Sequence, residues 1–85
     1  MNKYDKALEI GVKLYNLMKE LDYYNYLDYK ELENQEIKLL TLDILSGKTH
    51  DINELLTDVV DTNEDKKILS RVDLLKDDIN KFSVI

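Results

Sequence analysis

The chain has 85 residues, no Cys, no Pro, one His and a formal net charge of −6. The lack of cysteine excludes a disulfide framework, a thiolate nucleophile and a sulfur-based zinc site, and one histidine is too few for a histidine-rich metal site. Two glycines and no proline remove the repeated turn residues of an all-β protein. With 27 Ile, Leu and Val residues to build a core, the sequence predicts a single all-α domain over residues 1–85.

A first helix is predicted from about Tyr4 to Leu21. Small or apolar residues recur there at intervals of 4, 3, 4 and 3, which is the spacing of one helix face. They are Ala7, Gly11, Leu14, Met18 and Leu21. Gly11 costs ~1 kcal/mol relative to alanine in a helix. Two interpretations of it stay open: a second helix crosses closely at this position, or glycine is simply tolerated.

The second helix is predicted to begin between Asn25 and Tyr29 and to end at Ser46, with Gly47 as a left-handed stop. Apolar side chains within residues 37–45 point round most of its circumference. Such a helix has to be covered on more than one side. We therefore expect it to be the central element of the fold, or else to leave half of its surface for a partner.

A third helix is predicted to begin after Thr49 or Asp51. Its apolar positions follow the i, i+3, i+4, i+7, i+8 pattern of a helix face. They are Ile52, Leu55, Leu56, Val59 and Val60.

A fourth helix is expected after Thr62, because Asp65 three residues later gives the spacing of a helix cap. Its apolar residues recur at intervals of 4, 3, 4 and 3, and are Ile68, Val72, Leu75, Ile79 and Phe82. This coiled-coil-like seam can pack on a neighbouring helix or on a second copy of the chain. Together the elements predict a small three- or four-helix bundle.

The most uneven charge lies in residues 51–65, DINELLTDVVDTNED. The stretch has six acidic residues and no Lys, Arg or His, whereas acids and bases balance at twelve each elsewhere. The acids are Asp51, Glu54, Asp58, Asp61, Glu64 and Asp65. All but Glu64 follow one another at intervals of 3, 4, 3 and 4, so they would form one line on an unbroken helix. A cap at Thr62 would bend that line near Asp61.

Three interpretations of these acids stay open. They are the solvated side of an amphipathic helix, a surface for a basic patch on a protein partner, or a mimic of nucleic acid that occupies the cationic channel of a DNA- or RNA-binding enzyme. Direct binding to nucleic acid is not expected, because no basic stripe is present to neutralise phosphates. Tyr23, Tyr24 and Tyr26 are a second candidate contact surface, since tyrosine is enriched at interfaces. Their alternative role is packing over the open end of the bundle.

Two patterns match known ligand-binding loops incompletely. Asp61, Asn63 and Asp65 match the first three ligands of a calcium-binding EF-hand loop, but Lys66 stands where that loop requires glycine. Residues 47–49, Gly-Lys-Thr, match the end of a phosphate-binding loop without its first glycine or its preceding strand. Helix capping is the preferred interpretation of both patterns, so we expect no metal and no cofactor.

The sequence thus predicts a cytoplasmic, non-enzymatic protein that binds a protein partner with a basic surface. No secretory leader and no membrane-spanning apolar run is expected. His50 is expected to be exposed in a loop, and Asp43 is the carboxylate to check for burial. Eleven Lys against one Arg is typical of an AT-rich coding sequence, which favours a regulator or inhibitor from a phage or plasmid. The rival hypothesis is a structural homodimer held through the fourth helix.

Overall fold

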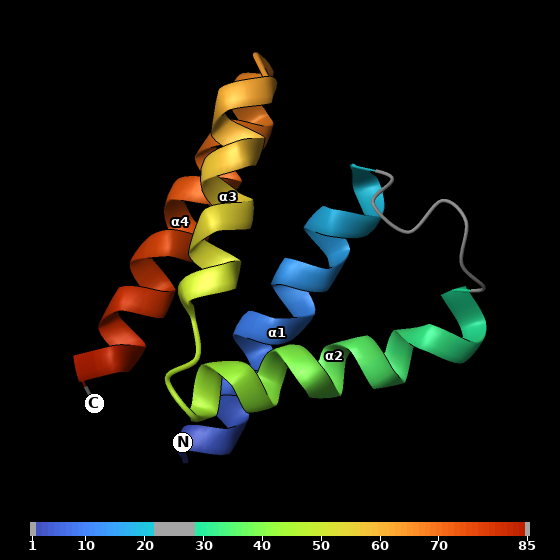
Figure 1. Ribbon diagram of the computed structural model, residues 1–85, viewed down its shortest axis with the longest axis vertical. Coiled ribbons are helices and arrows are strands. Elements are labelled where there is room, and N and C mark those ends of the chain that lie inside the picture. The colour runs from blue at the N-terminus through green and yellow to red at the C-terminus, as the bar shows by residue number, and fades with distance from the viewer. Residues whose placement is uncertain (1, 22–28, 85) are drawn as a thin grey trace.

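The computed structural model describes residues 2–21 and 29–84, apart from the side chains of 29–32, 83 and 84. These residues form four helices and no strand: α1 (Lys3–Glu20), α2 (Tyr29–Leu45), α3 (His50–Thr62) and α4 (Lys66–Val84). The prediction of a small all-α bundle is confirmed. α3 and α4 run side by side in opposite directions, and α2 crosses α1 at a steep angle (Figure 1).

The central helix of this bundle is α1. It packs against both α2 and α4, while α3 packs against α4. Its buried residues are Ala7, Ile10, Gly11, Leu14, Tyr15, Leu17 and Met18. Of the two expectations for the second helix, the central position is therefore wrong. The other, a surface left for a partner, stays a prediction; Leu39 and Leu42 on α2 are 55% and 46% exposed.

α2 crosses α1 at Gly11. A Cβ atom at Gly11 would lie 2.8 Å from Thr41 Oγ1 and 3.4 Å from the Thr41 backbone nitrogen. Thr41 is buried, and its hydroxyl donates a 2.7 Å hydrogen bond to the carbonyl oxygen of Ile37. The absent side chain thus lets the two backbones approach closely. The close-crossing interpretation of Gly11 is confirmed.

α2 ends in a glycine stop, as predicted. Gly47 has a φ of 77°, and its N–H donates to the carbonyl oxygen of Ile44 at 3.3 Å. The N–H of Lys48 donates to the carbonyl oxygen of Asp43 at 2.8 Å. These two hydrogen bonds are the Schellman motif of a helix C-terminus. Residues 47–49 therefore join two helices, and no strand precedes them in the described part of the chain.

The Gly47→Ala variant is expected to lose ~1 kcal/mol of unfolding free energy, because a Cβ at positive φ approaches the backbone carbonyl. No other atom lies within 4 Å of the Cβ position, so the backbone conformation is the source of the cost. Urea denaturation followed by circular dichroism measures the loss. Gly47→Asn is the control and should lose less, since asparagine tolerates the left-handed region. Equal losses in the two variants would contradict this explanation.

The turn between α3 and α4 differs from the prediction. Thr62 does not cap α4, because it lies in α3 and its hydroxyl donates to the carbonyl oxygen of Asp58 at 2.8 Å. Asp65 is the capping residue: its Oδ1 accepts a 2.9 Å hydrogen bond from the N–H of Lys67. Asn63 Nδ2 donates to the carbonyl oxygen of Val59 at 3.1 Å. Both Asn63 and Asp65 thus close helix ends, which is the capping role preferred over calcium binding.

The seam expected to hold a homodimer lies inside the single chain. Its members Val72, Leu75, Ile79 and Phe82 are all buried, and Ile68 packs against the same core. Because α4 packs on α1 and α3 through its buried face, a dimer of the folded chain would have to use other residues. The seam therefore has the first of its two predicted roles, packing on neighbouring helices of the same chain, and the homodimer stays a prediction. Leu74, at 65% exposure, is the large apolar side chain of α4 that faces solvent.

Candidate functional site

The acidic residues of α3 form one exposed line. They are Asp51, Glu54, Asp58 and Asp61, which we call the acidic line. Since α3 continues to Thr62, no bend interrupts them, and at 1.5 Å per residue they extend over ~15 Å of helix. The buried residues Ile52, Leu56 and Val59 occupy the other side of α3. This helix is amphipathic, with its charge gathered on the solvent side.

Glu64 and Asp65 do not continue the acidic line. Both are exposed, but they lie beyond the end of α3 in the link to α4. The carboxylate of Asp65 is occupied in capping α4. The structure therefore brings together four of the six predicted acidic residues on one helix.

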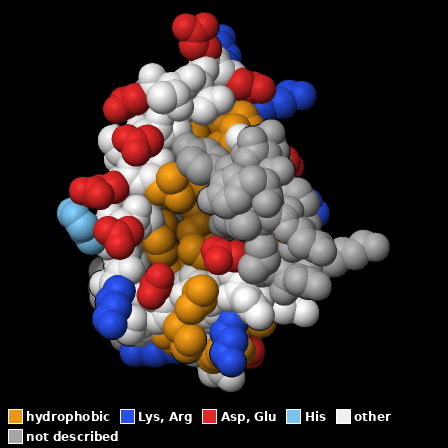
Figure 2. All heavy atoms as spheres, turned by 45° about the vertical axis from the view of Figure 1, so that its right-hand side comes forward, with side chains coloured by type: hydrophobic (Ala, Val, Ile, Leu, Met, Phe, Trp, Pro, Cys, Tyr) orange, Lys and Arg blue, Asp and Glu red, His pale blue; other side chains and the backbone are white. Residues whose placement is uncertain are grey.

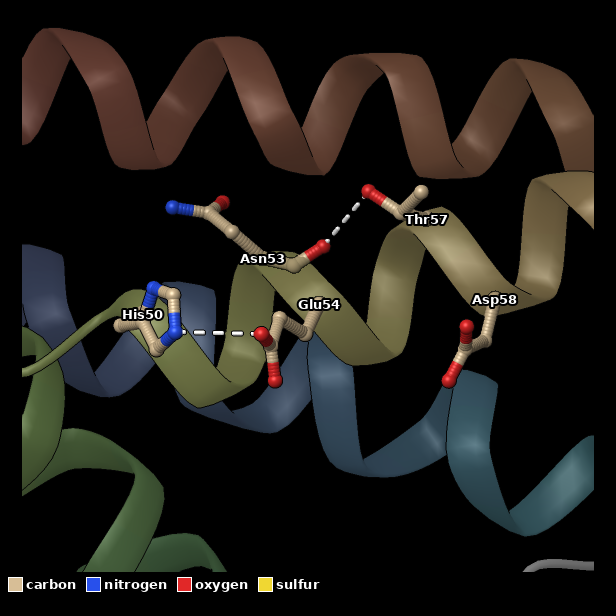
Figure 3. A pocket seen from close by; sticks show the side chains of 5 residues that line it. All are labelled: His50, Asn53, Glu54, Thr57 and Asp58. Atoms are coloured by element: carbon tan, nitrogen blue, oxygen red, sulfur yellow. Dashed lines mark hydrogen bonds and ion pairs between the residues drawn. The ribbon is translucent and has the colours of Figure 1, made fainter.

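Three members of the acidic line carry no ion pair with any described residue. Asp51, Asp58 and Asp61 are absent from the salt bridges of the described chain. Glu54 differs, since its Oε1 lies 3.1 Å from Nε2 of His50 (Figure 3). His50 is exposed as predicted, but it lies in the first turn of α3 and not in a loop. Most of the charge of the line is thus available to a partner.

A shallow hollow of about 540 Å³ runs along the same side of α3 (Figure 3). It is lined by His50, Asn53, Glu54, Thr57 and Asp58. The hydroxyl of Thr57 is directed back to its own helix, where it donates to the carbonyl oxygen of Asn53 at 2.9 Å. The volume of the hollow is within the range of small-molecule pockets. However, all of its lining residues come from one helix, so it cannot surround a ligand and bury most of the ligand's surface, as such pockets do. This geometry suits a contact surface better than an enclosed site.

His50, Asp51 and Glu54 are the group of potential metal ligands among the described residues. One ligand atom from each lies within 4.8 Å of the others. All three side chains are exposed and lie in the first turns of α3, where the positive end of the helix dipole disfavours a cation. The expectation of no metal site stays a prediction.

Exposed hydrophobic side chains share a face with the acidic residues. Figure 2 shows a column of acidic side chains beside the single histidine, which marks α3. Hydrophobic side chains lie next to this column and, lower in the view, toward α2. The exposed large hydrophobic residues of α2 are Leu39 and Leu42. They were not among the predicted site residues, although the apolar circumference of residues 37–45 was the signal that could have identified them.

The other candidate residues contribute less. Tyr23, Tyr24 and Tyr26 lie outside the described residues. Asp43 is partly exposed near the end of α2, and its carbonyl group takes part in the helix stop. The described candidate surface therefore consists of α3 and the uncovered side of α2.

Comparisons with family models, with curated proteins and with solved structures find no match to this chain. None of the helices in residues 2–21 and 29–84 combines the length and apolar content that crossing a membrane requires.

Proposed function

We propose that this protein acts by binding a protein partner that presents a basic surface, and that it does so as a cytoplasmic regulator or inhibitor without catalysis. The observation that carries the proposal is the acidic line, in which Asp51, Asp58 and Asp61 form no ion pair with a described residue. Complementary charge accelerates association and selects the partner. Glu64, Asp65, Tyr23, Tyr24 and Tyr26 complete the proposed contact set.

A binding role is also supported by the shape of the surface. Catalysis generally requires a site that excludes water from the reacting groups. The hollow beside His50 is lined from one side of α3 alone. It therefore favours contact with a macromolecular surface over chemistry on a small substrate.

Mimicry of nucleic acid is the second candidate function. The line presents one carboxylate per ~5 Å of helix axis, compared with one phosphate per ~3.4 Å along a DNA strand. The regular row of carboxylates favours mimicry of nucleic acid. Because the carboxylates are more widely spaced than DNA phosphates, they also suit a partner whose basic surface does not bind nucleic acid. A partner that is itself a DNA- or RNA-binding protein would support mimicry.

Charge reversal of the acidic line tests the proposal. The Asp58→Lys/Asp61→Lys variant is expected to weaken binding to the partner by at least about tenfold at low salt, with the loss in the association rate. High salt should shrink the difference, because exposed charges are screened. Affinity capture from the source cell at two salt concentrations identifies the partner, and surface plasmon resonance measures the rates.

The matched control is Glu33→Lys/Asp73→Lys, which changes the net charge equally on α2 and α4. Both residues are exposed and outside the salt bridges of the described chain. Asp77 is less suitable, because its hydrogen bond to Lys81 raises the pKa of that lysine. If the control and the test variant lose binding equally, net charge and not the acidic line is responsible, and the proposal fails.

A further inference from the structure

The uncovered side of α2 is the strongest unexplained feature of the described chain. Leu39 and Leu42 are three residues apart and therefore neighbours on one helix face. Thr41 faces α1 at the Gly11 crossing; Leu39 is about 200° from it round the helix and Leu42 about 100°. Two leucines about half exposed on one helix face gain from burial, which the described part of the chain does not provide.

The charges around this side of α2 are mainly negative. Glu36 and Asp43 lie three and four residues from Leu39, hence on its flank. Lys38, the one basic residue in residues 33–45, lies four residues before Leu42 and therefore also flanks this pair. The acidic line of α3 borders the same face of the molecule, with hydrophobic side chains between it and α2 (Figure 2). This face therefore has an apolar floor, with the acidic line along one side and Lys or Arg side chains beside its lower part (Figure 2).

We propose that the element that docks on this face is a cationic amphipathic helix of the partner. Its apolar stripe packs on Leu39 and Leu42, and its Lys or Arg side chains pair with the acidic line. Helices commonly bind in this way, through apolar anchors at i, i+3, i+4 and i+7. This inference rests on the proposed function and specifies the partner's contacting element.

A second copy of the chain is a poor occupant of the same face. A two-fold symmetric dimer places the same surface patch of each copy against the other. The acidic line of one copy would then approach that of its partner, in a protein of net charge −6. An anionic membrane surface is unsuitable for the same electrostatic reason. Charge complementarity thus selects a basic helix.

Two synthetic peptides test the inference. Each has about 18 residues, long enough to extend over ~27 Å as a helix. The first carries Leu at i, i+3, i+4 and i+7 and Lys at the other exposed positions, and the second carries the same lysines with Ser in place of every Leu. Fluorescence anisotropy at low salt is expected to show that the wild-type protein binds the first at least about tenfold more tightly than the second.

Leu39→Ser/Leu42→Ser should abolish the preference for the leucine-containing peptide. Leu74→Ser is the control, because it removes a leucine of α4 that is even more exposed, at 65%, and should leave the preference unchanged. Circular dichroism checks that each variant is folded.

Several outcomes would overturn the inference. The two peptides could bind equally well, and charge reversal of Asp58 and Asp61 could abolish the binding of both. The acidic line would then still be a binding surface, but Leu39 and Leu42 would not be part of it. The preference for the leucine-containing peptide could persist in Leu39→Ser/Leu42→Ser, or it could be lost in Leu74→Ser. Either result would show that the peptide helix binds at another surface. Sedimentation showing a dimer that dissociates in the Leu39→Ser/Leu42→Ser variant would assign the face to a second copy. Binding of neither peptide would reject a helical partner.

Discussion

The Gly11→Val variant is expected to lose roughly 3 kcal/mol of unfolding free energy, because overpacking at a tight contact costs this much. A Cβ at Gly11 would meet Thr41 Oγ1 at 2.8 Å, and the Thr41 nitrogen and the Ile37 carbonyl oxygen lie at 3.4 and 3.5 Å. The two more distant atoms belong to the backbone, so they cannot move aside as a side chain does. The branched side chain of valine therefore has to separate α1 from α2. Urea denaturation, followed by the helical circular dichroism signal, measures the loss of unfolding free energy.

A double-mutant cycle identifies the contact responsible. Gly11→Ala gains ~1 kcal/mol of helix propensity, but it loses more through the clash with Thr41 Oγ1, whose position is fixed by the hydrogen bond to Ile37. Thr41→Ala removes that oxygen and should rescue most of the loss. Thr41→Val keeps a group of similar size there and should rescue little. If Gly11→Ala stabilises the wild-type protein outright, the crossing tolerates a side chain and the explanation is wrong.

This crossing also shows how far the sequence could predict the fold. Helix periodicity indicates which side of a helix is buried, and the apolar stripes of α1, α3 and α4 were identified on that basis. Periodicity does not indicate what covers the stripe. The residues Val72, Leu75 and Ile79 fitted a dimer seam as well as an internal contact, and only the structure shows them in the core. In the same way, the apolar circumference of α2 fitted a central position as well as an uncovered surface, and the structure gives the central position to α1.

The candidate site was predictable to a similar degree. The spacing of Asp51, Glu54, Asp58 and Asp61 was sufficient to place them on one side of α3, because spacing within a helix is a local property. Asp65 would have continued the line only on an unbroken helix, and α3 ends at Thr62. Capping signals at Thr62 and Asp65 compete, and the Thr62 hydroxyl instead bonds within α3. How α2 and α3 are arranged relative to each other is tertiary information that no local pattern contains.

Removal of a central side chain should have the other large effect. The Leu14→Ala variant is expected to lose about 3 kcal/mol of unfolding free energy, because apolar burial is lost and a cavity remains. Leu14 is fully buried on α1, the helix that packs against both α2 and α4. A domain of this size has roughly 4–13 kcal/mol of unfolding free energy. The substitution therefore removes a large part of it, and the urea midpoint should fall with little change in slope.

Leu74→Ala is the stability control for Leu14→Ala, because Leu74 is 65% exposed and should change the free energy by less than ~0.5 kcal/mol. Leu39→Ala and Leu42→Ala should each lower the unfolding free energy only slightly more than Leu74→Ala does, because about half of each side chain already contacts water. This contrast separates the leucines that hold the bundle together from those available for recognition. If Leu39→Ala costs as much as Leu14→Ala, then α2 is buried on both sides in solution, and the face proposed for the partner helix does not exist.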